Sequence, residues 1–319
     1  MRQLVTGGAG FIGSGYVRHV LANTDDEVTV YDALTYAGNL STLRDVDDSP
    51  RYRFVQGDIC DPGTLEEAMA GHDAVVHFAA ESHVDRSIAG PDDFINTNCF
   101  GTNIVMDTAR RQEIPRVVHI GTDEVYGSVE VGSSSETDPL DPRSPYSASK
   151  AGADLIALSY AHTYGLPVSV TRCTNNFGPF QYPEKAIPLF TTNVLDGEPL
   201  PLYGDGLNER DWLHVDDHCA AVLLVLQEGE TGEIYNVGAG NETPNRVLVD
   251  KILALLDVGE EMVRYVEDRK GHDRRYSVDI AKVTALGWAR RRSLDEALGE
   301  TVAWYRDNRW WWEPLKARR

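Results

Sequence analysis

Leu4-Val5-Thr6-Gly7-Gly8-Ala9-Gly10-Phe11-Ile12-Gly13, near the start of the 319-residue chain, decides the fold. The residues at 2–6 predict a short buried strand, and an amphipathic pattern over 14–21 predicts a helix directly after the glycines. The glycines fit both GxGxxG and GxxGxxG, which allow a tight turn and the close approach of a pyrophosphate to a helix N-terminus. Such a pattern alone is weak, but the strand before it and the helix after it predict a phosphate-binding loop.

The same alternation of strand and helix continues through the first half of the chain. Strands are predicted at 27–32, 53–55, 74–80, 116–120 and 168–172, and helices at 64–70, 91–111 and 146–164. This order implies right-handed βαβ units, so the predicted fold class is α/β, a Rossmann-like doubly wound parallel sheet.

After Asn175 proline and glycine become dense, which predicts a smaller C-terminal α/β substrate-binding domain over the carboxyl edge of the sheet. We therefore expect a dinucleotide-binding domain at 1–174 plus about 213–237, and the smaller domain at 175–212 and 238–319.

Acidic residues follow two of the predicted strands. Asp32 is placed to accept hydrogen bonds from a ribose diol, and its charge would repel a 2′-phosphate, which favours NAD over NADP. Asp58 and Ile59 follow the third strand, where they could cap the adenine. A plain turn residue is an equal alternative for Asp58.

Composition limits the partners and the compartment. The formal net charge is −20, which repels phosphate backbones, so no nucleic-acid partner is expected. No apolar run is long enough to span a bilayer, and the early glycine motif leaves no room for a signal peptide. Cys60, Cys99, Cys173 and Cys219 form no CxxC motif, so free thiols in a reducing cytoplasm are expected.

Two groups of residues predict acid–base chemistry beside the cofactor. Thr122-Asp123-Glu124 follows the fifth strand, and Tyr146 and Lys150 are four apart on the next helix, hence on one face. A nearby ammonium would favour the phenolate, so Tyr146 could take a proton from an alcohol. Two adjacent carboxylates could supply one acid and one base. As a bare dipeptide they would more often form a solvated turn, but their place between Thr122 and YxxxK favours chemistry.

Longer phrases carry a resemblance that covers essentially the whole chain. The glycine-rich start, Asp32, Asp58-Ile59 and YxxxK resemble extended short-chain dehydrogenase/reductases. Further phrases are more specific: FAAESHVDRS (78–87), TDEVYG (122–127), SPY (144–146), TNNFGP (174–179), PEK (183–185), RDW (210–212) and DRKGHD (268–273). In these the chain resembles dTDP-glucose 4,6-dehydratases, in particular those of actinobacterial deoxysugar pathways for secondary metabolites such as antibiotics.

The resemblance implies a lyase that converts dTDP-glucose to dTDP-4-keto-6-deoxyglucose. Tyr146 would remove the C4 hydroxyl proton as hydride passes to NAD, with Lys150 as its tuning cation and Thr122 bonded to the same oxygen. The C4 ketone acidifies the C5 proton, which Glu124 would take while Asp123 donates a proton to the departing C6 oxygen. Hydride would then return to C6.

The same resemblance implies the remaining site residues and the assembly. Cofactor contacts are expected from Gly7, Gly10, Phe11, Ile12, Gly13, Asp32, Asp58, Ile59, Ala80, Tyr146 and Lys150. Nucleotide-sugar contacts are expected from Ser82, Thr122, Asn176, Lys185, Arg210, Asn245, Arg269 and His272, with the two arginines offsetting the diphosphate charge. Each of these arginines could instead be a surface ion pair. Arg86 is expected to be structural, and a homodimer is expected to form through the helices around 97–111 and 146–164.

Three alternative functions stay open. The first is the same reaction on a UDP-, CDP- or GDP-hexose, and the second is an NDP-hexose 4-epimerase, which usually lacks the two carboxylates. The third is a catalytically silent NAD-binding regulator or scaffold.

Two further sequence features have plain structural interpretations. His214 and His218 have the spacing of a zinc motif, but its glutamate and a third ligand are missing, so no metal is expected. Asp216 or Asp217 is expected to cap a helix there. Trp310-Trp311-Trp312 is expected to be a packed end of the smaller domain.

Overall fold

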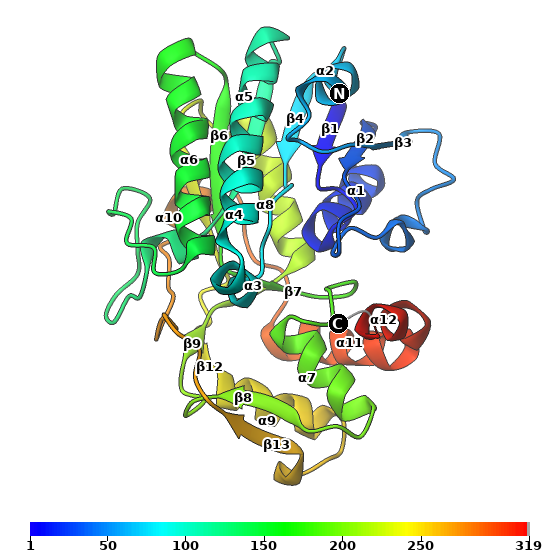
Figure 1. Ribbon diagram of the computed structural model, residues 1–319, viewed down its shortest axis with the longest axis vertical. Coiled ribbons are helices and arrows are strands. Elements are labelled where there is room, and N and C mark those ends of the chain that lie inside the picture. The colour runs from blue at the N-terminus through cyan, green and yellow to red at the C-terminus, as the bar shows by residue number, and fades with distance from the viewer. Residues whose placement is uncertain (318–319) are drawn as a thin grey trace.

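A seven-stranded parallel sheet forms the centre of the computed structural model, which describes residues 1–317 (Figure 1). The strand order β11-β6-β5-β4-β1-β2-β3 is that of a doubly wound Rossmann sheet, which confirms the predicted fold class. The strands are β1 (Arg2–Thr6), β2 (Glu27–Asp32), β3 (Tyr52–Gln56), β4 (Ala74–His77), β5 (Arg116–Thr122), β6 (Val168–Cys173) and β11 (Ile234–Val237). The sequence pattern had not singled out β11.

Helices cover both faces of the sheet, because successive strand residues point to opposite sides. Leu4, Val75 and Val117 face one helix layer, and their neighbours Val5 and Val76 face the other. The first layer holds α2 (Pro62–Met69), α5 (Thr102–Arg111) and α6 (Pro145–Tyr164); the second holds α1 (Phe11–Asn23) and α8 (Val215–Glu228). Shorter helices are η1 (Leu40–Leu43), α3 (Val84–Ala89), α4 (Pro91–Phe94), η3 (Asp123–Tyr126), η4 (Glu260–Met262) and α10 (Ala281–Ala285).

Two predicted elements differ from the structure. The fourth strand ends at His77 rather than at residue 80, because Phe78 and the two alanines after it leave the sheet to line a cavity. The helix predicted at 91–111 is interrupted by a π-helical segment, η2 (Ile95–Gly101). Inside this segment the Asn98 amide bonds to both backbone groups of Glu81, at 2.8 and 3.0 Å, so the wider turn anchors the chain that follows β4.

The C-terminal part of the chain forms a second lobe beyond the carboxyl edge of the sheet (Figure 1). Its core lies between α7 (Ala186–Leu195), α9 (Asn245–Leu255) and α11 (Leu294–Asp307), with Trp311 and Trp312 of α12 (Arg309–Lys316) buried nearby. Trp310 is half exposed. The smaller domain is predicted to reach residue 319, and residues 318 and 319 lie outside the described part.

Short strand pairs complete this lobe. They are β7 (Asn175–Phe177) with β10 (Trp212–His214), β8 (Leu200–Tyr203) with β13 (Val263–Val266), and β9 (Glu209–Arg210) with β12 (Thr243–Pro244). Over residues 1–317, no helix combines the length and the apolar character needed to cross a bilayer.

Candidate active site

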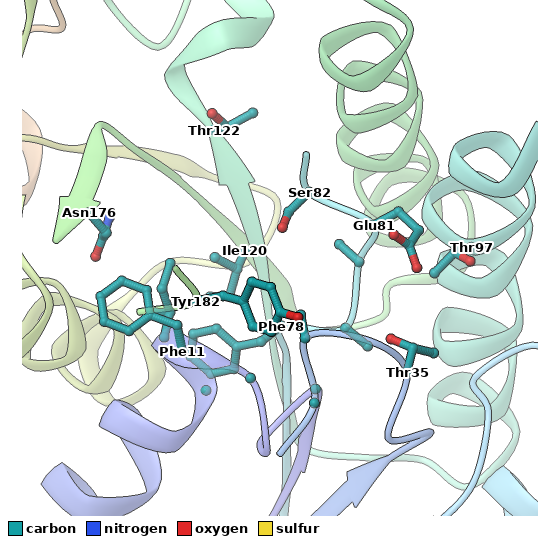
Figure 2. Close-up of a pocket in the computed structure, with 18 of the residues that line it drawn as sticks. Phe11, Thr35, Phe78, Glu81, Ser82, Thr97, Ile120, Thr122, Asn176 and Tyr182 are labelled. Carbon is teal, nitrogen blue, oxygen red and sulfur yellow. The ribbon is translucent and has the colours of Figure 1, made fainter. Parts of the chain in front are cut away.

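One cavity of about 310 Å³ brings most of the predicted site residues together. Figure 2 shows Phe11, Phe78 and Ile120 beside the polar side chains of Thr122 and Asn176. The cavity lining includes all the predicted catalytic and cofactor-binding residues and four of the predicted substrate residues: Thr122, Asp123, Glu124, Tyr146, Lys150, Gly7, Gly10, Phe11, Ile12, Gly13, Asp32, Asp58, Ile59, Ala80, Ser82, Asn176 and Lys185.

The glycine-rich loop is shaped to receive a phosphate. Gly7 has φ +69°, and a Cβ there would lie 2.6 Å from the backbone nitrogen of Ala79. A Cβ on Gly13 would lie 2.3 Å from the carbonyl oxygen of Gly7. Gly10 caps α1 without a side-chain hydrogen bond, so the first-turn N–H groups at the cavity are left for an anionic ligand. The loop therefore fits a pyrophosphate.

Asp32 is held rigidly at the end of β2. Its Oδ2 accepts from the backbone N–H of Ala9 at 2.9 Å, and its Oδ1 accepts from Leu34 at 2.8 Å. Each oxygen keeps a second lone pair that could accept a ribose hydroxyl. Asp58 also lines the cavity, while its Oδ1 accepts from the backbone of Cys60 at 2.8 Å, so it holds its own turn as well.

Thr122, Asp123 and Glu124 lie where β5 passes into the short helix η3. The Thr122 hydroxyl accepts from the Glu124 backbone N–H at 3.3 Å and so caps this turn. Tyr146 and Lys150 are both buried on α6, whose start is fixed by a capping box at Ser144. The Lys150 ammonium donates to the carbonyl of Ile120 at 2.5 Å, which joins α6 to the end of β5.

The two adjacent carboxylates stand in different electrostatic surroundings. Burial raises the pKa of Asp123 well above its ordinary value, and the negative charges of Glu124 and Asp211 raise it further. Burial also raises the pKa of Glu124, but the positive charges of Arg269, Arg210 and Lys185 lower it. Asp123 is therefore the better proton donor of the pair, and Glu124 the better acceptor.

Burial dominates the two groups on α6. It raises the pKa of Tyr146 well above its ordinary value, followed by the charge of Glu124, while a hydrogen bond with Thr122 lowers it. Burial lowers the pKa of Lys150. The sequence had predicted that the ammonium makes Tyr146 more acidic; in the protein burial is the largest influence on the pKa of Tyr146, and Thr122 supplies the influence that lowers it.

The predicted substrate residues lie at different distances from the cavity. Lys185 donates to the carbonyl of Ser82 at 2.5 Å. The Arg210 guanidinium lies 4.2 Å from the centre of the Tyr276 ring. Arg210 and Arg269 are outside the cavity lining, but their charges act on Glu124. His272 bonds to Asp268 at 2.5 Å. Asn245 starts α9 and is not in the lining.

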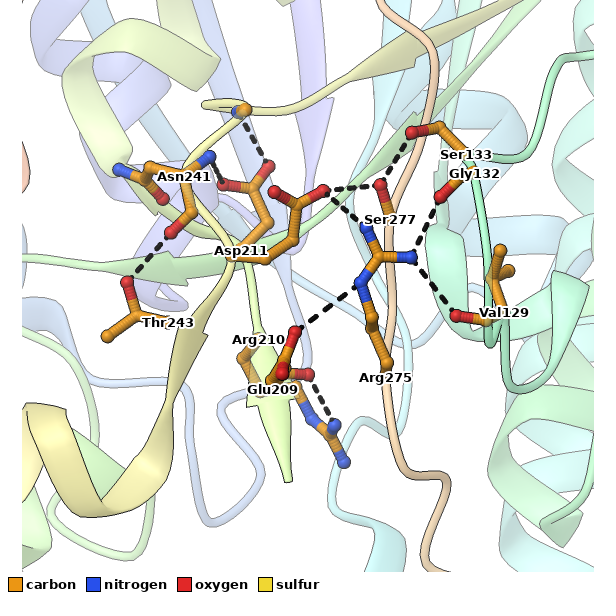
Figure 3. Close-up of polar contacts among 12 residues, drawn as sticks. Val129, Gly132, Ser133, Glu209, Arg210, Asp211, Asn241, Thr243, Arg275 and Ser277 are labelled. Atoms are coloured by element: carbon orange, nitrogen blue, oxygen red, sulfur yellow. Dashed lines mark hydrogen bonds and ion pairs between the residues drawn. The ribbon is translucent and has the colours of Figure 1, made fainter. Parts of the chain in front are cut away.

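A polar network behind Arg210 fixes this side of the site (Figure 3). Asp211 accepts the backbone N–H groups of residues 239, 240 and 241 at 2.7, 3.1 and 3.0 Å. Arg275 pairs with Glu209 at 3.4 Å and Glu242 at 3.3 Å, and donates to the carbonyls of Val129 and Gly132. The network thus ties the loop after η3 to the second lobe.

A cluster at the cavity that the sequence did not predict joins three separate segments. Arg86 lies 3.9 Å above the ring of Tyr36, in the loop after Asp32, and its Nε donates to Glu184 at 3.1 Å. The rings of Tyr36 and Tyr182 meet edge to face, 5.5 Å apart. Tyr36 lies four residues after the cofactor aspartate Asp32 in the sequence, and this nearness was the signal that could have revealed it.

The histidine pair of the zinc-like motif has other partners. His214, rather than Asp216 or Asp217, caps α8: its Nδ1 accepts from the backbone of Asp216 at 3.2 Å. This corrects the predicted cap, and the carboxylate of Asp217 instead receives the backbone N–H groups of residues 291 and 292. The His218 ring lies 2.9 Å from the amide oxygen of Asn176.

Known proteins resemble the chain over its whole length. The sequence profile of the family described as "GDP-mannose 4,6 dehydratase" matches residues 4–301. A dTDP-glucose 4,6-dehydratase of Streptomyces niveus is 54% identical, covering 99% of this chain and 96% of that one. Another, of Streptomyces antibioticus, is 55% identical, covering 100% and 96%.

Solved structures show the same similarity. The crystal structure of DesIV, a dTDP-glucose 4,6-dehydratase from Streptomyces venezuelae with NAD and TYD bound, is 56% identical with a TM-score of 0.97, covering 99% of this chain and 100% of that one. A UDP-glucose 4-epimerase of Thermotoga maritima is more distant, at 32% identity and a TM-score of 0.89, covering 96% and 99%.

Proposed function

The chain belongs to the GDP-mannose 4,6 dehydratase family, and we propose that its reaction is the NAD-dependent 4,6-dehydration of dTDP-glucose to dTDP-4-keto-6-deoxyglucose. It is a hydro-lyase of the extended short-chain dehydrogenase/reductases. The observation that carries this proposal is the pair of adjacent carboxylates, set beside a buried Tyr and Lys in one cavity, with the pKa of Asp123 raised well above its ordinary value and more positive charges acting on Glu124. A dehydrogenase or an epimerase needs no such second pair of proton-transfer groups.

The residues of the site have separate roles in this proposal. Tyr146 takes the proton of the C4 hydroxyl in its phenolate form, which the hydrogen bond with Thr122 favours, and Thr122 bonds to the same substrate oxygen. The C4 ketone makes the C5 proton acidic, and Glu124 removes it. Asp123, protonated because its pKa is raised, delivers a proton to the departing C6 oxygen, so that one water leaves.

NAD, when bound, would accept hydride from C4 and return it to C6, while a proton returns to C5 to complete the saturated product. Gly7, Gly10 and the first turn of α1 would hold its pyrophosphate, and Asp32 its ribose. The negative charge of Asp32 disfavours NADP, because a 2′-phosphate would lie against this carboxylate.

The substrate side of the site is positive within an acidic protein. Arg210, Arg269 and Lys185 surround Glu124 and would also offset the charge of a nucleoside diphosphate. We assign hydrogen-bonding contacts with the nucleotide-sugar to Ser82, Asn176 and His272, which lie on the cavity or beside Arg269. Asn245 has less support, since its neighbours are Asn208 and the start of α9.

The experiment that tests this function is incubation of purified protein with dTDP-glucose. A 4-keto product, followed by its absorbance in alkali, should form without stoichiometric consumption of added NAD. Equal turnover of UDP-, CDP- or GDP-hexoses would contradict the preference for dTDP. Inversion at C4 without loss of water would establish the epimerase alternative. Bound NAD with no conversion of any nucleotide-hexose would establish a binding protein.

We further propose a homodimer formed through η2, α5 and α6. Helices α5 and α6 stand side by side on one face of the sheet (Figure 1), and η2 and α6 expose Phe100 and Leu155 by 52% and 58%. Exposed apolar side chains on adjacent helices favour pairing with a second copy. Light scattering should give a dimer mass for the wild type and a lower mass for Leu155→Glu; a wild-type monomer at micromolar concentration would contradict the proposal.

We also propose a cytoplasmic location and a place in the synthesis of a deoxysugar for an antibiotic. The four cysteines are free, in keeping with a reducing compartment. The resemblance to Streptomyces dehydratases supports the pathway. Loss of the deoxysugar product in a deletion strain would test this place.

A further inference from the structure

Helix α6 carries a third polar residue on the face that holds Tyr146 and Lys150. Asp154 follows at the same spacing of four residues, so the three side chains lie along one side of the helix. Its side chain is completely buried and is outside the described cavity lining. Any influence of Asp154 on the reaction must therefore pass through its neighbours.

Those neighbours include the end of β5. A Cβ on Gly121 would lie 2.8 Å from Oδ1 of Asp154, so the carboxylate packs directly on this backbone. Nε2 of His119 lies 3.3 Å from the same oxygen. The carbonyl of Ile120, between them, accepts from the Lys150 ammonium. Asp154 and Lys150 together thus hold three consecutive residues of the strand that ends in Thr122-Asp123-Glu124.

Asp154 also forms an ion pair with one buried cation, Arg172, and its charge acts on a second, Lys150, four residues earlier on α6. Nε of Arg172, on the neighbouring strand β6, lies 2.9 Å from Oδ2 of Asp154, and its second nitrogen donates to the hydroxyl of Tyr126 at 2.8 Å. Arg172 is buried as well, as is Lys150. Removing the carboxylate would leave two cations in an apolar layer without this anion, which strongly favours loss of a proton from the lysine.

The other groups facing Lys150 cannot replace this charge. His77 on β4 and His119 on β5 are buried, which lowers the pKa of each ring and keeps it neutral near pH 7. Burial lowers the pKa of Lys150; the charge of Asp154 is the first influence that raises it, ahead of Cys173 and Cys99. Burial raises the pKa of both thiols, so they stay neutral near pH 7.

We propose that Asp154 is a positioning residue of this active site: its carboxylate is the counter-ion that keeps the Lys150 ammonium charged and docked on the end of β5. Through Lys150 it supports the proton transfer by Tyr146. This last step rests on the proposed function.

The direct test is an NMR titration of selectively labelled lysine side chains, with the Lys150 signal identified by its loss in Lys150→Met. In Asp154→Asn we expect the pKa of Lys150 to fall by about 1–3 units. The apparent pKa of the alkaline limb in the pH profile of kcat/KM for dTDP-glucose should fall as well. Asp154→Glu should restore the Lys150 pKa and this pH profile. An unchanged Lys150 titration in Asp154→Asn would overturn the inference.

A second variant covers the case in which the lone arginine prevents folding. Asp154→Leu with Arg172→Met replaces the ion pair with apolar side chains, which buried sites often tolerate. A smaller fall in the Lys150 pKa than in Asp154→Asn is expected, because the arginine charge is removed together with the carboxylate, and a wild-type titration would overturn the inference. In the wild type itself, a Lys150 that is neutral at pH 7 would also overturn it.

Val170→Ala serves as the matched control. It truncates a buried side chain on the same strand as Arg172 without changing any charge, so the thermal midpoint should fall while the Lys150 titration stays in place. A failure of the proposed function can be distinguished from a failure of the proposed role of Asp154. If the wild type does not dehydrate dTDP-glucose, the proposed function is wrong, but the NMR result still decides the role of Asp154.

Discussion

Replacing Glu124 with glutamine should separate the two halves of the reaction. The amide has nearly the shape of the carboxylate but cannot take the C5 proton. Loss of a positioned base typically slows proton transfer by roughly 10²–10⁴-fold, which corresponds to about 3–5 kcal/mol in the activation free energy. Formation of the 4-keto-6-deoxy product should fall by that factor.

The first half of the reaction should survive this substitution. The charge of Glu124 raises the pKa of Tyr146, so removing it makes the phenolate easier to form. In a stopped-flow experiment with dTDP-glucose, the near-ultraviolet absorbance of reduced cofactor should therefore rise quickly and persist. In the wild type the same signal should be transient.

Stability provides a check on the same variant. Burial raises the pKa of Glu124 in the folded protein, and a raised carboxyl pKa means that its ionised form costs stability as the pH rises. Glutamine has no such cost, so the thermal midpoint should be unchanged or higher. Glu198→Gln, which removes an exposed carboxylate paired with Lys316, is the control for net charge and should keep full activity.

Two results would refute the reasoning. Product formation within about tenfold of the wild type, far less than the loss of a base causes, would show that Glu124 is not the base. A variant that neither reduces its cofactor nor forms product, although folded, would show that Glu124 acts before the elimination.

Three more predictions follow from the same geometry. Gly121→Ala would force a methyl group against the carboxylate of Asp154 and should destabilise the fold by about 1–3 kcal/mol, measured by thermal unfolding; an unchanged midpoint would contradict this packing. Arg86→Ala removes the cation–π contact with Tyr36, which stabilises by about 0.5–2 kcal/mol, so the purified protein should retain less NAD. The retained NAD is measured after its release by denaturation. Equal retention by the variant and the wild type would count against a role of this cluster in cofactor binding. Because the pKa of Asp123 is raised, the carboxyl keeps its proton near neutral pH and loses it as the pH rises through the raised pKa. The rate of the elimination step should therefore fall on the alkaline side. A rate that does not change with pH there would argue against Asp123 as the acid.

Local sequence was enough to predict the elements whose conformation depends on residues close by in the chain. The loop from Gly7 to Gly13 needs positive φ or a missing Cβ at fixed positions, and only glycine supplies these. Tyr146 and Lys150 share a face because a helix repeats every 3.6 residues. For the same reason the fold class could be predicted from alternating strands and helices, although β4 was predicted too long and the π-helical segment η2 was not foreseen.

Long-range packing decided the surroundings of each charge, which no spacing encodes. Arg210 and Arg269 act on Glu124 from distant segments of the second lobe, and Asp211 acts on Asp123 from the same side. Electrostatic energy depends on distance and burial in space, so the proton donor and acceptor could be distinguished physically only after folding brought these groups together. The sequence by itself determined that Thr122-Asp123-Glu124, Tyr146 and Lys150 are present in the right order; the tertiary structure decided which charges lie around each carboxyl, because those charges come from distant segments.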